Sequence, residues 1–441
     1  MRETHNNYSE QEKSKGSSSN LSTTTSSSPP SAKNNIKTIE NVLILQGGGS
    51  LGAFGCGVFK ALAKRNIKID IVAGTSIGGV NAAIIAGSKD GDSAEQLLEQ
   101  FWLELSEGFV DLNNINSFSY FSIPTFTKGL LHSYYPYSLF EREGAEEEKN
   151  YQHTNSNEKI KIKQIRSFYS SVIFGNDKMF KPRWRPEYAN SDPEYFTPQK
   201  WTYLYDHSPL AKTLDRYIDY KKLNPDGNPN ARLIITATNV LTAQPLVFDS
   251  SKQQITAKHI LATSGYPLYN FPWVEVEKSV YAWDGSLLSN TPLREVIDAS
   301  PVNDKRIFLV ENYPKRIDVL PRNLPEVYHR ARDIIFSDKT ESNVTMSKVI
   351  TRYLQYIEEL YQIVEKYTDH TKLDKEKLKR IRRKYKKYKE ERGAEIKQIF
   401  HISRDERFPH IYENADFSPE TIKNSIEEGE IKINQAMGDV E

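Results

Sequence analysis

The sequence contains a single cysteine, Cys56, among 441 residues, and only four methionines. One cysteine excludes an internal disulfide framework, so the composition fits a cytoplasmic protein. No run of apolar residues is long enough to cross a bilayer. The N-terminus also lacks the apolar stretch of a secretory signal. We therefore expect a soluble protein that is at most peripheral to a membrane.

An excess of charge of one sign is also missing. The chain has 59 Lys and Arg against 58 Asp and Glu, which gives a net charge of +1. No global field attracts nucleic acid, so we expect no nucleic-acid partner. A zinc site is unsupported, because Cys56 lies between glycines and no H-x₃-H pair occurs. We expect no metal and no other cofactor, and Cys56 is expected to be a core residue.

Composition divides the chain into regions. Residues 1–37 are Ser, Thr, Asn and charge, so a disordered tail is expected. Residues 38–340 are expected to form an α/β domain, within which the aromatic-rich residues 109–206 form a cap or lid. Residues 341–441 are expected to be a charged, helical extension that packs on the core. Beyond residue 323 the pattern predicts only helices, at Leu324–Phe336, Asn343–Tyr367 and Lys372–Arg392.

The α/β prediction depends on the order of elements after residue 40. An all-apolar strand at residues 41–45 precedes a glycine-rich stretch and a helix at 58–64. A second strand, at residues 69–72, leads into a turn and another helix. This alternation predicts a parallel sheet with helices between its strands. Further strands are predicted at residues 233–239, 245–248, 280–283 and 306–310.

The turn after the second strand has the pattern G-x-S-x-G, with Ser76 between Gly74 and Gly78. A sharp strand-to-helix turn leaves no room for a Cβ on either side, which explains both glycines. The Ser76 hydroxyl would then lie at the N-terminus of a helix, where unpaired N–H groups favour negative charge. Ser76 is a candidate nucleophile, and the alternative is a serine that only caps the helix.

The glycine-rich stretch, residues 47–52, follows the first strand. Successive glycines expose backbone N–H groups and create an anion-binding nest. Gly47, Gly49 and Gly52 also fit the dinucleotide pattern G-x-G-x-x-G, but the acidic candidate, Asp70, comes near the start of its strand. The other use of such a nest is an oxyanion hole. Parallel neighbouring strands would bring this stretch and the Ser76 turn to one edge of the sheet.

Asp284 ends another predicted strand and is followed by Gly285 and Ser286. At the same edge of the sheet this carboxylate could accept the Ser76 proton as a general base. The alternative is an Asx turn. A histidine base would have to come from the four histidines downstream, none of which has the setting of a catalytic loop: His329, His370, His401 and His410.

The basic run at residues 377–389 could attract anionic lipid headgroups. A solvated helix face is the alternative, and Glu376, Glu390 and Glu391 flank the run.

Together the three motifs resemble those of the patatin-like phospholipase family. Residues 47–52 are similar to its glycine-rich oxyanion motif, residues 74–78 to its nucleophile elbow, and residues 284–286 to its D-G-A/G motif. Segments at 262–267, 283–293 and 416–421 resemble one prokaryotic subgroup of the family. The resemblance runs from about residue 42 to about residue 429.

The resemblance implies a patatin-like, three-layer α/β/α fold around a mostly parallel sheet. It implies that Ser76 is the nucleophile and Asp284 the base of a dyad without histidine. The implied oxyanion donors are the N–H groups of Gly47, Gly48 and Gly49, and Gly52, Gly74, Gly78 and Gly285 support the motifs. The implied reaction is hydrolysis of a lipid acyl ester through an acyl-enzyme, without a metal.

Two positions depart from the family pattern. Leu51 stands where many members have Arg, and Ser286 replaces Gly or Ala. A hydrogen bond from the Ser286 hydroxyl to ionised Asp284 would lower its basicity. The alternatives kept open are a general esterase or thioesterase, a histidine triad with His329 or His401, a nucleotide-binding protein, and a lipid-binding relative without catalysis. The sequence leaves the oligomeric state open.

Overall fold

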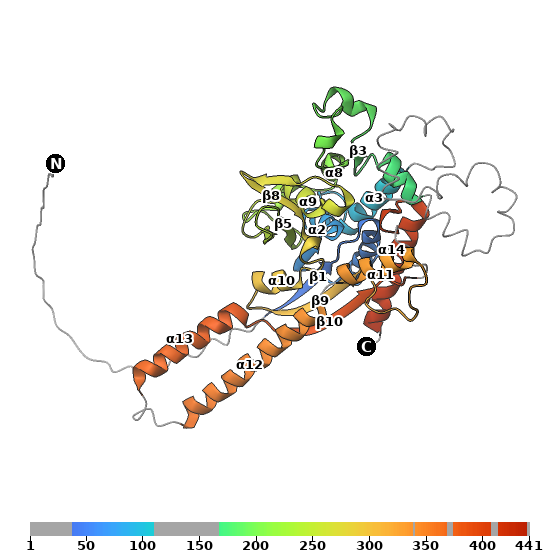
Figure 1. Cartoon of the computed structure of the whole chain (residues 1–441). Helices are drawn as coiled ribbons and strands as arrows, with labels where there is room; N and C mark the ends of the chain where they lie inside the picture. The colour runs from blue at the N-terminus through green and yellow to red at the C-terminus, as the bar shows by residue number, and fades with distance from the viewer. Residues whose placement is uncertain (1–37, 110–166, 338–339, 368–373, 407–412, 439–441) are drawn as a thin grey trace, which may run out of the picture. The chain divides into compact units, whose positions relative to one another are not determined.

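The computed structural model describes residues 38–109, 167–337, 340–367, 374–406 and 413–438. Its main sheet has eight strands, with the order β10-β9-β1-β2-β5-β8-β7 and β6 also paired to β5. Figure 1 labels β10, β9, β1, β5 and β8 in this sequence across the sheet. The strands are β1 (Ile39–Leu45), β2 (Ile71–Thr75), β5 (Arg232–Asn239), β6 (Pro245–Asp249), β7 (Val274–Glu277), β8 (Val280–Asp284), β9 (Asp304–Glu311) and β10 (Ile396–Ser403).

The five strands from β10 to β5 run parallel, whereas β6, β7 and β8 add antiparallel pairs. All of β2 and most of β1 are buried, as expected for strands covered on both faces. Alternate residues of these strands belong to two separate cores. Leu43, Leu45 and Val72 face one core, and Val42, Ile44 and Ile71 face the other.

The larger core lies beneath helices whose apolar sides pack on one face of the sheet. Phe54 of α1 and Phe101 and Trp102 of α3 are fully buried there. A Cβ on Gly57 would lie 1.8 Å from the Ile426 carbonyl oxygen, so α1 and α14 are in backbone contact. The helices on this face are α1 (Ala53–Lys64), α2 (Ile77–Gly87), α3 (Ala94–Glu107), α9 (Ala257–Ser264) and α14 (Pro419–Gly438).

The smaller core lies on the other face and includes Leu293, Val296 and Val344. These residues belong to α10 (Leu293–Ala299) and α12 (Thr340–Tyr367). α13 (Lys375–Arg392) pairs with α12 through stacked Tyr361 and Tyr385 rings, whose centroids are 5.5 Å apart. The predicted three-layer α/β/α fold and the C-terminal helices are therefore confirmed.

One C-terminal prediction is wrong. The sequence pattern predicts only helices beyond residue 323, but β10 pairs in parallel with β9 at the edge of the sheet. Phe400 and Ile402 are buried and His401 between them is exposed, an alternation that is typical of an edge strand. α14 also packs directly on α1. The C-terminal region therefore contributes a strand and a core helix in addition to surface helices.

Only part of the predicted cap lies among the described residues. Residues 167–174 are helical, followed by β3 (Lys181–Pro182), short 3-10 turns, β4 (Tyr205–Asp206) and α8 (Ser208–Leu214). The predicted disordered tail at 1–37 and residues 110–166 lie outside the described part. α11 (Leu324–Phe336) connects the end of β9 to α12. No helix in the described ranges is both long and apolar enough to span a membrane.

Candidate active site

Ser76 stands at the N-cap of α2, directly after β2, with φ 57° and ψ −132°. This conformation is costly for a residue with a side chain and is typical of a serine raised on a sharp turn. The flanking glycines are required sterically. A Cβ on Gly74 would lie 2.2 Å from the Gly78 carbonyl oxygen, and a Cβ on Gly78 would lie 2.1 Å from the Leu45 carbonyl oxygen. The Ser76 N–H donates to Thr263 Oγ1 at 3.0 Å, which fixes the turn.

The glycine-rich stretch forms the neighbouring loop, between β1 and the 3-10 turn η1 (Gly49–Gly52). Gly49 has φ 60°, and a Cβ there would lie 2.2 Å from the Asn414 carbonyl oxygen. Gly48 and Gly49 line the pocket that contains Ser76. The Gly47 N–H instead donates to Asn290 Oδ1 at 3.2 Å. Gly48 and Gly49 are therefore better placed than Gly47 to bind an anion.

Gly52 is also close to the Ser76 turn, because a Cβ on it would lie 2.8 Å from the Ile77 side chain. Asp70 lies at the other end of β2, where its Oδ2 accepts from the Asn41 N–H at 2.9 Å. This position removes the acidic partner that a dinucleotide site at residues 47–52 would need.

Asp284 reaches Ser76 from an antiparallel strand. In the register of the sheet, Thr75 lies opposite Thr236, and the next residue of β5, Ala237, lies opposite Asp284. β8 starts beyond the carboxyl edge of the parallel strands and runs back, so its last residue comes level with the Ser76 turn. Gly285 is needed there, since a Cβ on it would lie 2.6 Å from the Thr236 carbonyl oxygen.

The Asp284 carboxyl is fully buried. Burial raises its pKa to about 6, although the hydrogen bond from the Ser286 backbone and the nearby Ser76 side chain act in the opposite direction. Oδ1 accepts from the Ser286 N–H at 2.8 Å, and Oδ2 has no hydrogen-bond partner among the described residues. A buried carboxyl with a raised pKa beside a serine is an arrangement suited to proton transfer.

The Ser286 hydroxyl lowers the pKa of Asp284, in the direction predicted, but its effect is small. It donates to Asn290 Oδ1 at 2.8 Å, and it is the weakest of the groups that lower the pKa of Asp284. Asn290 is a residue that the sequence analysis missed as a site component. Its Oδ1 accepts from both Ser286 and Gly47, while its Nδ2 donates to the Phe336 carbonyl oxygen at 3.0 Å. Asn290 therefore connects the loop after Asp284 to the glycine-rich loop.

Gln46 and Asn312 are two further missed residues. Gln46 Oε1 accepts from the Asn312 N–H at 2.7 Å, and Asn312 Nδ2 donates to the carbonyl oxygens of Gln46 and Gly47. Both side chains are buried. These bonds hold the start of the glycine-rich loop. In the sequence, the local signal for this role is a Gln directly before three glycines.

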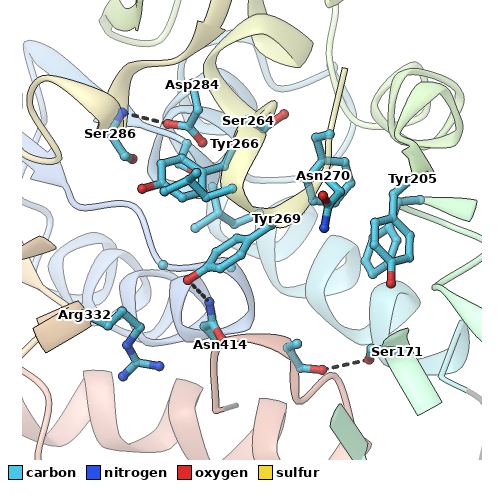
Figure 2. A pocket seen from close by; sticks show the side chains of 18 of the residues that line it. Ser171, Tyr205, Ser264, Tyr266, Tyr269, Asn270, Asp284, Ser286, Arg332 and Asn414 are labelled. Carbon is cyan, nitrogen blue, oxygen red and sulfur yellow. Dashed lines mark hydrogen bonds between the residues drawn. The ribbon is translucent and has the colours of Figure 1, made fainter. Parts of the chain in front are cut away.

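The pocket at this edge of the sheet has a volume of about 910 Å³. Figure 2 shows Asp284 and Ser286 at one end, Tyr205 and Ser171 at the other, and Tyr269 between them. The wall between these ends is aromatic and aliphatic, which suits an acyl chain. Apolar lining residues on this side include Phe168, Met179, Phe180, Trp184, Leu204, Tyr205, Leu210, Phe271 and Phe417.

Several of these lining residues come from the described part of the predicted cap. Phe180 packs edge-on against Tyr205 and Phe271, with ring centroids 5.5 and 5.4 Å apart. The sequence analysis missed His207, which also lines the pocket. Burial lowers the pKa of His207, and its Nε2 lies 3.0 Å from the Leu261 carbonyl oxygen.

The histidines considered as alternative bases lie elsewhere. His329 is buried in α11, where its Nε2 lies 2.6 Å from Glu406 Oε1. His401 lies on the edge strand β10, with its Nδ1 3.4 Å from Glu311 Oε2. Neither residue lines the pocket that contains Ser76. His370 and His410 fall outside the described residues. Cys56 is fully buried, which raises the pKa of its thiol.

A cluster of four side chains has the composition of a cation site: His329, Asp333, Glu406 and Glu413, whose candidate ligand atoms all lie within 4.8 Å of one another. Two arginines already contact members of this cluster. Arg332 donates to Glu413 at 2.9 Å and lies 3.1 Å from His329 Nδ1, and Arg404 donates to Glu413 at 2.8 Å. The cluster is therefore better described as a buried ion-pair network than as a metal centre.

The basic run at 377–389 forms most of α13. Lys389 pairs with Glu358 of α12 at 3.0 Å, and Lys386 and Lys387 face Glu390 and Glu391 at 3.8 and 3.6 Å. These pairs partly neutralise the C-terminal half of the run.

A family model described as "Patatin-like phospholipase" matches residues 43–297. No curated protein matches the chain. Among solved structures, VipD from Legionella pneumophila is 15% identical over 91% of this chain and 67% of its own, with a TM-score of 0.38. The type III effector ExoU is 11% identical over 91% of this chain and 54% of its own, with a TM-score of 0.27. ExoU of Pseudomonas aeruginosa, in complex with SpcU, is 19% identical over 67% of this chain and 47% of its own, with a TM-score of 0.23. The chain thus spans about half the length of the ExoU chains.

Proposed function

The chain belongs to the patatin-like phospholipase family, and we propose that it hydrolyses acyl esters of lipids through a dyad of Ser76 and Asp284. The observation that carries this proposal is the position of a strained serine beside a buried carboxyl, at the end of an apolar pocket. Neither group alone would indicate a reaction. Together they supply a nucleophile, a base and space for an acyl chain.

In the first half-reaction, Ser76 Oγ attacks the ester carbonyl carbon while its proton passes to the ionised Asp284 carboxylate. With a pKa near 6, this carboxylate is a stronger base than an ordinary aspartate and is still ionised at neutral pH. The carbonyl oxygen becomes an oxyanion. The N–H groups of Gly48 and Gly49, at the start of η1, are the proposed donors, because the first N–H groups of a helical turn have no partner within it.

The tetrahedral intermediate then collapses. The alcohol leaves with the proton from Asp284, and the acyl group remains on Ser76. In the second half-reaction, a water molecule gives its proton to Asp284 and attacks the acyl carbon. Collapse of this second intermediate returns the proton to Ser76 and releases the carboxylic acid. No group outside the dyad and the oxyanion donors is needed for the proton balance.

Labelling with a fluorescent fluorophosphonate tests the proposal without knowledge of the substrate. We expect the wild type to be labelled, Ser76→Ala to show no labelling, and Asp284→Asn to be labelled far more slowly. His207→Ala, at the histidine that lines the same pocket, and His329→Ala serve as controls for a histidine base. Both variants should keep their labelling when folded. A folded wild type without labelling, but with tight lipid binding, would favour a relative that has lost catalysis.

Hydrolysis assays then separate the remaining alternatives. Release of fatty acid from diacyl phospholipid vesicles would identify a phospholipase. Turnover restricted to short soluble esters or thioesters would favour the general esterase.

A further inference from the structure

α11 has its polarity reversed relative to an ordinary surface helix. Such helices bury an apolar stripe and expose polar residues. In α11 the buried side chains include His329, Arg332 and Asp333, and all three are less than 9% exposed. Phe336, at the end of the helix, is buried as well. Six other apolar residues occupy the opposite face, hereafter the α11 apolar face: Leu324, Val327, Tyr328, Ala331, Ile334 and Ile335.

The buried polar face is stable because its charges are paired. Arg332 donates to Asp333 Oδ1 at 2.8 Å and to Glu413 Oε1 at 2.9 Å. His329 bonds to Glu406, as described above. Buried charges are tolerated only when they are paired and hydrogen-bonded in this way. The network therefore fixes the rotation of α11, and this rotation directs the apolar face outward.

The α11 apolar face is unusually exposed. Its five large side chains are between 45% and 68% exposed. Their spacing of three and four residues places them on one stripe of the helix. Single exposed apolar residues need no explanation, but a contiguous stripe of them indicates a binding surface.

The position of the face indicates its partner. Leu324, Tyr328 and Ile335 also line the pocket that contains Ser76, so the apolar surface continues into the site. Leu268, another lining residue, is 74% exposed. In the loop before α11, Leu320 is 83% exposed. The interior of a lipid layer is apolar, so it is a suitable partner for an apolar surface that continues into a pocket for acyl chains.

The charges around the face suit the surface of such a layer. Outside the buried network, residues 315–335 carry four basic and two acidic side chains. Lys315 pairs with Glu311 at 2.7 Å and Arg322 with Glu326 at 3.3 Å, which leaves Arg316 and Arg330 against Asp318. A local excess of positive charge beside an inserting apolar face favours anionic headgroups.

We propose that the α11 apolar face and the loop before it dock on an anionic lipid surface and place the mouth of the pocket against the bilayer. This inference deepens the proposed function, since it names the surface through which a lipid substrate reaches Ser76. It also locates membrane contact on α11 and not on the basic run of α13.

The test uses the full chain with vesicles of ether-linked phosphatidylcholine and phosphatidylglycerol, which contain no ester to cleave. Val327 and Ile334 belong to the face but do not line the pocket. The double variant Val327→Ser/Ile334→Ser should lower the vesicle partition coefficient by about tenfold or more, because it removes two inserting aliphatic side chains. The matched control is Ile357→Ser/Ile363→Ser on α12, where the two side chains are 44% and 53% exposed, and it should partition as the wild type does.

Hydrolysis of soluble p-nitrophenyl butyrate, measured in parallel, should be the same in the wild type and both double variants. If neither the wild type nor the variants hydrolyse this ester, the proposed chemistry is wrong. The partition measurement still tests the docking proposal in that case, because it does not depend on hydrolysis. Equal partition of the α11 variant and the wild type would overturn the docking proposal, as would loss of binding in the α12 control alone. A wild-type dimer in size-exclusion chromatography that the α11 variant converts to monomer would also overturn it, by assigning the face to a second copy.

Discussion

Asp284→Asn is expected to stabilise the folded protein at neutral pH while removing hydrolysis. The wild type must hold an ionised carboxylate in a fully buried position at neutral pH, and this raises its pKa from 3.8 to about 6. An asparagine has nearly the same shape and no charge. Its Oδ1 can still accept from the Ser286 N–H, so the substitution removes the charge with little change in packing.

The magnitude follows from the pKa. A shift of this size corresponds to about 3 kcal/mol, since each pKa unit is worth about 1.4 kcal/mol. The folded state binds more protons than the unfolded state between the two pKa values, so wild-type stability falls as pH rises through this window. The advantage of the variant should therefore be about 3 kcal/mol at pH 8 and roughly half of that at pH 5.

Urea unfolding followed by circular dichroism at pH 8 and pH 5 measures both values. Asp249→Asn is the matched control with the opposite sign. Burial alone would raise the pKa of Asp249, but the hydrogen bond from Arg232, at 2.9 Å, holds it below its ordinary value. Asp249→Asn should therefore destabilise the protein at pH 8. An Asp284→Asn protein that is no more stable than the wild type at pH 8 would refute the reasoning.

Three further outcomes are expected. The kcat/KM for a soluble ester should fall about tenfold per pH unit below about pH 6, because Asp284 must be ionised to accept the proton; a profile that is flat to pH 4.5 would contradict this. Ser76→Gly should gain about 1 kcal/mol of stability relative to Ser76→Ala in urea unfolding, because glycine adopts φ 57° and ψ −132° more easily. Gly57→Ala should lose about 2 kcal/mol or more by forcing α1 from Ile426, whereas Gly438→Ala, with open space around its Cβ, should change stability by less than about 1 kcal/mol.

The motifs that the sequence predicts best are those with a steric cause close in the chain. Gly74 is such a case, because its Cβ would meet the Gly78 carbonyl oxygen within the turn itself. Gly78 fits the same local motif, but the group that its Cβ would meet is the Leu45 carbonyl oxygen of β1, which the turn alone does not reveal. The position of Asp284 beside Ser76 depends on more, since β8 must run antiparallel to β5 and stop at one register position. The sequence pattern contains the strand but not its direction.

Residues that act through distant partners could not be predicted in this way. α11 is amphipathic in sequence, and the usual expectation is that its apolar face is buried. Its orientation is reversed because Arg332 and His329 find buried carboxylates 81 and 77 residues later in the chain. β10 was missed for a related reason. Four of its eight residues are apolar, but Ile399 and Phe400 are adjacent and break the strict alternation of an edge strand, so only the pairing with β9 identifies it.

The match to the family ends at residue 297, yet the glycine-rich loop is held by residues beyond that point. Gln46 bonds to Asn312 and to the Phe336 carbonyl oxygen, and Ser50 donates to the Glu413 carbonyl oxygen at 2.8 Å. The proposed catalytic residues therefore lie in the matched part, whereas the bonds that hold the loop come from the C-terminal part. The same C-terminal segments supply Tyr328, Phe336 and Phe417 to the pocket wall. The side chains of these three lining residues are not among the groups that bond to the glycine-rich loop, so substitutions there are expected to alter which lipids enter the pocket while leaving the proposed reaction at Ser76 intact.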